Sequence, residues 1–224
     1  MGRRQDVIEA VARAMSALPT TRVLRVAVDG VDGAGKSFFA DELARAVRAA
    51  GRCVIRASVD GFHNQRAVRY LKGRSSPVGF FEDSYDYATL EAVLLGPLGP
   101  GGSRHYRVAA FDHRTDRAVE APVEIAAPGD ILIFDGIFLH RPELRAHWDY
   151  SVFLEVRFAV SVARMAERDA SSPDPDAESN RRYVGGQEIY LARCQPRRWA
   201  SVVINNDDLA SPYIVVEPAR EVTP

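Results

Sequence analysis

Residues 30–37 read GVDGAGKS, the most informative stretch of the sequence. It matches the pattern G-x-x-x-x-G-K-[ST], a loop whose backbone cradles the phosphates of a nucleoside triphosphate. The apolar run 22–28 predicts a strand before the loop, and apolar residues at helical spacing in 38–47 predict a helix after it. This order surrounds one bound polyphosphate with backbone N–H groups and a helix N-terminus.

The residue types of the loop suit this task. Glycines permit backbone angles and close approaches that a Cβ would block. Lys36 can place its charge on the β- and γ-phosphates, and the Ser37 hydroxyl can bind Mg²⁺. Lysine occurs only at Lys36 and Lys72, so a chain that otherwise uses arginine keeps lysine at the motif position. We expect the nucleotide to contact Gly30, Asp32, Gly33, Ala34, Gly35, Lys36, Ser37 and Phe38.

Composition narrows the class of protein. A chain of 224 residues with 46% hydrophobic and 26% charged residues suits one soluble α/β domain. The net charge of −1 argues against nucleic acid as a partner, and no apolar run is long enough to span a membrane. Cys53 and Cys194 form no disulfide framework, which favours a cytoplasmic location. Assembly into a homo-oligomer stays open.

Strand and helix patterns alternate along the chain, which favours a mostly parallel sheet covered on both faces. The whole pattern predicts a single three-layer P-loop NTPase domain over 1–224. Segment 60–125 would form an acceptor-side insert with a small β-hairpin, and 164–186 a helical lid. Residues 60–88 are expected to be irregular, and strands near 104–110 and 118–125 to form the hairpin. The remaining helices are predicted at 4–17, 36–50, 87–95, 157–170 and 179–193, and the strands at 22–29, 52–58, 130–135, 149–156, 201–205 and 213–217.

Two carboxylates follow predicted strands, where ligands bind in an open parallel sheet. Asp60 comes after strand 52–58 and could accept a proton from an incoming hydroxyl as a general base; an Asp-Gly turn is the structural alternative. Asp135 follows four apolar residues, a pattern typical of a carboxylate that binds Mg²⁺ directly or through water. The predicted metal site therefore consists of Ser37 and Asp135.

Arginines and other polar residues supply the rest of a phosphate-transfer site. Arg164 and Arg168 share one helix face beside a Pro/Asp-rich break, so a lid carrying them could close over the phosphates and exclude water. A solvated basic helix face is the alternative. Arg181 and Arg182 lie on the far side of the break. Further polar side chains could shape an acceptor pocket: His63, Asp83, Tyr85, Asp86, Tyr106, His113, Arg114 and Gln187.

Together these motifs resemble the uridine kinase / phosphoribulokinase-like family of P-loop kinases, over about residues 22–206. The resemblance is carried by GVDGAGKS, SVDGFH at 58–63, DSYD at 83–86, AFDHR at 110–114, IFDGIF at 133–138, RMAERD at 164–169, the Q…P stretch 187–196, and VVINN at 202–206. It implies ATP and Mg²⁺ as cofactors, and transfer of the γ-phosphate to a hydroxyl of a small molecule, most often a nucleoside.

The resemblance also implies roles for individual residues. Lys36, Asp60 and Arg168 would be catalytic, with Asp60 as the general base. Asp83 would hold sugar-like hydroxyls of the acceptor. Arg164 would face the nucleotide, and Asn205 and Asn206 would lie near adenine. The acceptor would be bound by Asp60, Phe62, His63, Asp83, Tyr85, His113, Arg114 and Gln187.

Three departures from the family pattern concern the metal side and the acceptor side. Asp135 stands where uridine kinases usually have Glu, the break 171–179 lacks their R-G-R-like run, and the hairpin segment at Asp112–His113 is shorter. Pantothenate, a riboside or a sugar therefore remain alternative acceptors. An ATPase or scaffold without a small-molecule acceptor is a further alternative. A GTPase switch is disfavoured, because its usual N-K-x-D segment needs a lysine, and the two lysines lie elsewhere, Lys36 in the loop and Lys72 in LKGR at 71–74.

Overall fold

The computed structural model describes residues 4–18 and 21–216, and it confirms the predicted fold class. A six-stranded sheet runs in the order β10-β9-β8-β1-β7-β2. Neighbouring strands are parallel except β10, which is antiparallel to β9. The strands are β1 Leu24–Gly30, β2 Val54–Ser58, β7 Ile131–Gly136, β8 Tyr150–Glu155, β9 Val202–Asn205 and β10 Tyr213–Val216. Residue 217, which we had expected to extend the last strand, lies outside the described residues.

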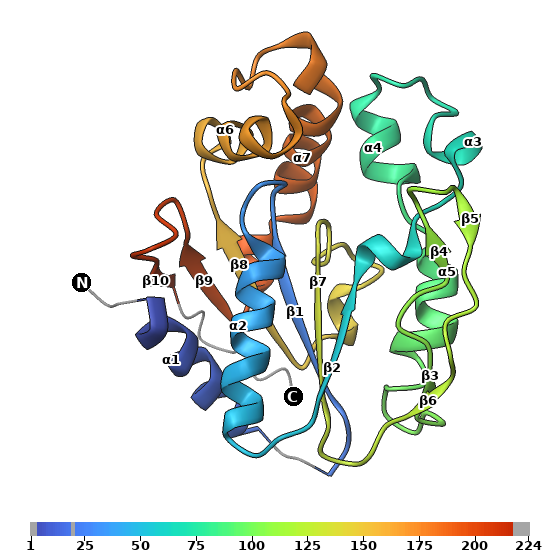
Figure 1. Ribbon diagram of the computed structural model, residues 1–224, viewed down its shortest axis with the longest axis vertical. Helices are drawn as coiled ribbons and strands as arrows, with labels where there is room; N and C mark the ends of the chain where they lie inside the picture. Colours follow the sequence, from blue (N-terminus) through green and yellow to red (C-terminus); the bar gives the residue numbers. More distant parts are fainter. Residues whose placement is uncertain (1–3, 19–20, 217–224) are drawn as a thin grey trace.

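Helices cover both faces of this sheet (Figure 1). Side chains of β7 alternate between the two layers, because successive residues of a strand point to opposite faces. Ile131 and Ile133 pack with α1 and α2, whereas Leu132 and Phe134 pack with α4, α5 and α7. Both faces of β1 and β7 are therefore buried, as expected for central parallel strands. The long helices are α1 Arg4–Ser16, α2 Lys36–Ala49, α6 Phe158–Asp169 and α7 Arg181–Cys194.

The segment expected to be irregular contains short helices instead. Ser76 Oγ accepts a hydrogen bond from the Gly79 N–H, and Pro77 occupies the first turn of the helix that follows, so local capping starts α4. Helices this short carry no readable periodicity, which explains the missed prediction. The short helices of the described residues are η1 Val59–Phe62, α3 Arg66–Arg69, α4 Pro77–Asp83, α5 Tyr87–Leu90, η2 Glu91–Leu95, η3 Arg145–His147, η4 Glu178–Asn180 and α8 Pro196–Trp199.

The hairpin is present as two short ladders. Strand β3 His105–Tyr106 pairs with β6 Glu124–Ile125, and β4 Phe111–Asp112 pairs with β5 Arg117–Ala118. It lies beside β2 and α5 (Figure 1). The Ala110 N–H donates to the Gly61 carbonyl at 2.8 Å, which ties the hairpin to the end of β2.

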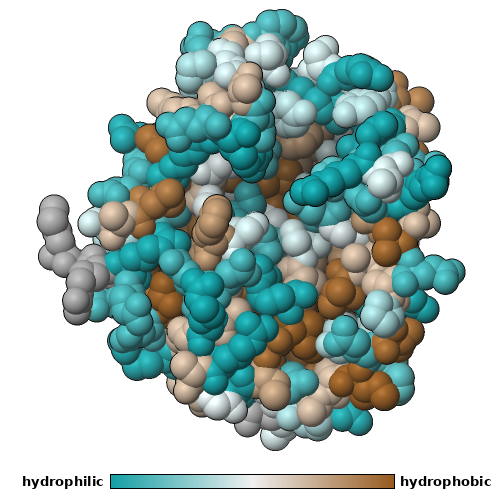
Figure 2. All heavy atoms as spheres, viewed as in Figure 1, coloured by the Kyte–Doolittle hydropathy of each residue, from teal (hydrophilic) through white to brown (hydrophobic). Residues whose placement is uncertain are grey.

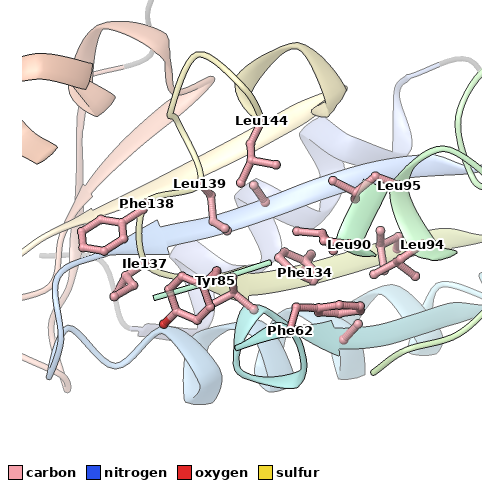
Figure 3. Packing of buried hydrophobic residues seen from close by; sticks show 14 of the residues in the cluster. Phe62, Tyr85, Leu90, Leu94, Leu95, Phe134, Ile137, Phe138, Leu139 and Leu144 are labelled. Atoms are coloured by element: carbon pink, nitrogen blue, oxygen red, sulfur yellow. The ribbon is translucent and has the colours of Figure 1, made fainter. Parts of the chain in front are cut away.

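An apolar cluster lies on the face of the sheet that α4, α5 and α7 cover. Figure 3 shows Phe62 and Phe134 packed among leucines, with Tyr85 at the edge and its hydroxyl turned away from them. Above the sheet, a hollow separates the part of the molecule that carries α6 and α7 from the part that carries α3 and α4 (Figure 2). None of the described helices is long and apolar enough to cross a membrane.

Candidate active site

The phosphate loop connects β1 to α2 and is shaped by its glycines. Gly33 and Gly35 adopt φ of 73° and 84°, in the left-handed region that favours glycine. A Cβ on Gly33 would overlap the carbonyl of Ser161 on α6. The fully buried Asn206 donates from Nδ2 to the Ala34 carbonyl at 2.7 Å. The loop is thus held open by backbone geometry and by contacts with α6 and the segment after β9.

Two residues at the start of α2 point toward polyphosphate chemistry. Lys36 Nζ donates to the Val31 carbonyl at 2.8 Å, across the loop itself. Ser37 Oγ donates to Asp135 Oδ2 at 2.7 Å, and Arg56 Nη2 donates to Asp135 Oδ1 at 3.0 Å. A hydroxyl beside a carboxylate suits Mg²⁺, which takes few protein ligands and completes its shell with phosphate and water. The described residues include no cluster of three or more His, Cys, Asp or Glu side chains able to hold a metal.

A cavity of about 430 Å³ lies over this loop. Lys36 and Ser37 line it from α2, Asp135 lines it from β7, and Arg164 and Arg168 line it from α6. The side chain of Phe38, 77% exposed, and that of Leu209 form an apolar part of the lining. The cavity therefore combines a cradle, cations and an apolar wall, which a nucleoside triphosphate requires.

A second cavity, of about 340 Å³, adjoins the first. Its lining includes Phe80 from α4, Tyr183 from α7, His63 directly after η1 and His113 from the hairpin. The residues that line both cavities are Asp32, Asp60, Tyr85, Ile137, Met165 and Arg168. The two spaces therefore meet at a pair of carboxylates and one arginine, beside the phosphate loop.

Aromatic and imidazole rings form one wall of the second cavity. The His63 ring lies 4.5 Å from that of Tyr85 and 4.7 Å from that of His113, measured between centroids. Burial lowers the pKa of His63, although the nearby Asp60 acts in the opposite direction. Burial also raises the pKa of Tyr85 well above its ordinary value. Both side chains are therefore neutral near pH 7 and offer ring faces and hydrogen-bonding atoms rather than charge.

Arg164 and Arg168 line the cavities, whereas Arg182 lies outside both linings. Arg164 reaches the loop and its support: it donates to the carbonyls of Gly33 at 3.4 Å and Asn206 at 3.0 Å. Arg168 lines both cavities and pairs with Asp169 through two N–H groups, at 2.8 and 2.6 Å. Arg182, by contrast, is buried and donates to carbonyls of the α3–α4 region, so its role is structural.

Several predicted site residues lie outside both linings. Asp83 pairs with Lys72 Nζ at 2.8 Å, and Phe62 is buried in the core. Buried Gln187 accepts a hydrogen bond from the Asp32 N–H, so it supports the loop from beneath. Arg114 is exposed on the hairpin. Asn206 supports the loop as described above, and Asn205 Oδ1 accepts from the Asp207 N–H at 3.2 Å.

The structure also adds lining residues that we had not predicted. Phe80 and Tyr183, whose rings meet edge to face at 5.0 Å, come from α4 and α7. Met165, Ile137 and Leu209 contribute apolar surface. Met165 lies three residues before Arg168 on α6, so the two side chains share one face of the helix. This spacing was the one sequence signal that could have identified Met165 as a lining residue. The others depend on how distant segments pack.

The fold and the site define a P-loop kinase. The model of the phosphoribulokinase / uridine kinase family matches residues 25–179, and the chain belongs to this family. No curated protein matches the chain.

Among solved structures, the chain is similar to one described as a possible uridine kinase from Bacillus stearothermophilus, with a TM-score of 0.70, 22% identity, and coverage of 89% of this chain and 97% of the other. It is also similar to a putative fructose transport system kinase from Silicibacter sp. TM1040, with a TM-score of 0.66, 25% identity, and coverage of 86% and 95%. The phosphoribulokinase of Rhodobacter spheroides gives a TM-score of 0.55 at 16% identity, with coverage of 84% and 71%.

Proposed function

We propose that this kinase transfers the γ-phosphate of ATP to a hydroxyl of a small neutral acceptor, with a nucleoside as the first candidate. The observation that carries the proposal is the junction of the two cavities, where Asp60 and Arg168 line both. A donor phosphate on the loop and an acceptor in the second cavity would meet there. Such positioning supplies much of the catalysis in phosphoryl transfer.

In the proposed mechanism, the N–H groups of the loop and Lys36 hold the β- and γ-phosphates. Ser37 and Asp135 would hold Mg²⁺, which neutralises developing charge when bound. Asp60 would accept the proton of the attacking hydroxyl. No described residue donates a hydrogen bond to its carboxylate, so both oxygens are available to the acceptor. Arg168 would stabilise charge on the transferred group, with Arg164 ordering the loop from the α6 side.

The charges of the second cavity favour a neutral acceptor. Among its described lining residues, Arg168 is the only arginine or lysine, and its guanidinium is already paired with Asp169. Asp32 and Asp60 add negative charge. An acceptor with a carboxylate or phosphate at this end would be repelled, which argues against pantothenate and phosphorylated sugars.

The aromatic wall favours a ring-bearing acceptor. Tyr85, Tyr183 and Phe80 offer ring faces and edges in a space of about 340 Å³, and stacking on aromatic side chains is a common way to hold a base. A sugar is the second candidate. It is supported by the 25% identity with the putative fructose transport system kinase, and by the polar ring nitrogens of His63 and His113.

We further propose that residues 1–224 form one kinase domain, in which 60–125 builds the acceptor side and 164–186 acts as a lid. The lid assignment is supported by Arg168 and Ser171, which line the cleft on either side of the α6 C-terminus. Closure of this segment would exclude water from the γ-phosphate.

The test is ADP release from MgATP with a panel of uridine, cytidine, fructose, ribose and pantothenate, with products identified by mass spectrometry. We expect uridine or cytidine to stimulate turnover most, and pantothenate least. Turnover that only sugars stimulate would move the assignment to the second candidate. ATP turnover that no alcohol stimulates would overturn the proposal in favour of an ATPase without a small-molecule acceptor.

A further inference from the structure

Asp32 is the third residue of the phosphate loop, yet it faces the acceptor cavity as well as the nucleotide cavity. Its backbone N–H donates to Gln187 Oε1, and Gln187 Nε2 donates to the Tyr183 carbonyl at 2.9 Å. Helix α7, which also lends Tyr183 to the acceptor wall, therefore fixes the position of Asp32. Hydrogen bonds through Gln187 therefore link the phosphate loop to the helix that lines the acceptor cavity.

The Asp32 carboxylate lacks a partner among the described residues, since none of them donates a hydrogen bond to it. Burial raises the pKa of this carboxyl; Lys36 lowers it and Asp60 raises it. A carboxylate that lines both cavities and has no protein donor is free to accept a hydrogen bond from a bound molecule. Phosphate oxygens cannot supply one, because they are acceptors and carry the same sign of charge. A hydroxyl of the acceptor molecule can.

Asp83 was the residue expected to hold sugar-like hydroxyls, and its surroundings differ. Lys72 Nζ lies 2.9 Å from Asp83 Oδ1 and 2.8 Å from Oδ2, so both oxygens are engaged. Asp83 lines neither cavity. Two carboxylates that line both cavities therefore lack a hydrogen-bond donor among the described residues, Asp60 and Asp32.

We infer that Asp32 is a specificity-determining residue: it binds a second hydroxyl of the acceptor while Asp60 serves the hydroxyl that is phosphorylated. This inference rests on the proposed function. It narrows the substrate class to polyols, such as a riboside with free 2′- and 3′-hydroxyls. Because Asp32 lies on the phosphate loop, a hydroxyl bound there also sets the distance between the acceptor and the γ-phosphate.

The test compares Asp32→Ala, the isosteric Asp32→Asn and Asp83→Asn with the unchanged protein. Uridine, 2′-deoxyuridine and 3′-deoxyuridine serve as acceptors, and MgATP affinity is measured separately by calorimetry. We expect Asp32→Ala to reduce kcat/KM for uridine about 10- to 100-fold, as for a lost hydrogen bond to a charged group. For one of the two deoxy analogues, kcat/KM should fall much less in Asp32→Ala, because that analogue lacks the hydroxyl that Asp32 binds. The ratio of kcat/KM for uridine to kcat/KM for this analogue should therefore fall toward one. MgATP affinity should fall much less than kcat/KM for uridine, and Asp83→Asn should keep the preference.

Two results would overturn the inference. One is a loss of MgATP affinity in the Asp32 variants with the uridine preference intact, which would assign the carboxylate to the nucleotide. The other is collapse of the preference in Asp83→Asn but not in the Asp32 variants.

Failure of the proposed function is distinguishable, because uridine binding in the presence of MgADP is measured as well. If uridine binds but is not phosphorylated, uridine is rejected as the phosphate acceptor. The ratio of the affinities for uridine and deoxyuridine then still tests the role of Asp32. Absence of both uridine binding and uridine turnover would reject the riboside assignment. Unchanged far-ultraviolet circular dichroism checks that each variant folds.

Discussion

Ser37 Oγ lies 2.7 Å from Asp135 Oδ2, and this hydrogen bond joins the first turn of α2 to the end of β7. The relationship brings together two residues that are 98 positions apart in the chain. Each is a ligand type that Mg²⁺ accepts, and each lines the nucleotide cavity. The first prediction follows from this pair.

Replacing Asp135 with Asn should raise the Mg²⁺ concentration for half-maximal turnover about 10- to 100-fold, because the site loses a charged oxygen. Magnesium titration of ADP release measures this shift, and EDTA should stop turnover of the unchanged protein. Asp130→Asn, at the opposite end of β7, is the matched control. Equal Mg²⁺ dependence in both variants would remove Asp135 from the metal site.

The two lysines of the chain form a natural comparison. Lys36→Ala should abolish turnover, since it removes the charge aimed at the β- and γ-phosphates. Lys72→Ala should retain turnover, because Lys72 pairs with exposed Glu82 and with Asp83 outside both cavities. ADP release and thermal melting are measured for both. Near-normal turnover of a folded Lys36→Ala protein would exclude the loop from the mechanism.

Asp60→Asn should lower kcat on the order of 100-fold or more, as expected for a lost general base, while MgATP still binds. Steady-state turnover and calorimetry separate the two quantities. Because the Asp60 side chain is exposed in the cleft, the substitution should leave the melting temperature nearly unchanged. An unchanged kcat would exclude proton transfer to this carboxylate.

A buried polar network beneath the loop predicts an effect on stability. Asp29 is fully buried; it accepts hydrogen bonds from the Tyr190 hydroxyl, from His140 Nδ1 at 2.6 Å and from the Gly30 N–H at 2.7 Å. Tyr190→Phe should lower the free energy of unfolding by about 1–3 kcal/mol, because one donor to a buried carboxylate is lost.

Urea unfolding measures this change, and Tyr213→Phe at the exposed side chain of β10 is the control. We expect the control to differ from the unchanged protein by less than about 0.5 kcal/mol. Equal stability of the two variants would mean that the Asp29 network contributes little to the fold.

Much of the fold was predictable because its signals are local. The glycine loop is a contiguous pattern, and the apolar strands and amphipathic helices repeat with fixed periods. The six strands of the sheet and the four long helices begin and end within two residues of the predicted bounds, apart from residue 217, which is outside the described part. The short helices of 60–88 were missed because they depend on caps such as Ser76 and on packing against α7 rather than on periodicity.

The site, like the fold, has a part with local sequence signals and a part that depends on packing between distant segments. The sequence alone determined the nucleotide side, because a phosphate cradle is made by one short stretch of backbone together with Lys36 and Ser37. Which side chains line the second cavity depends on tertiary packing. Asp32 is held by Gln187, 155 residues away, whereas Asp83 is engaged by Lys72 and lies outside the linings of both cavities. The physical reason is that a side chain's charge and hydrogen bonds are shared with whatever neighbour packing brings to it, and spacing along the chain does not specify that neighbour.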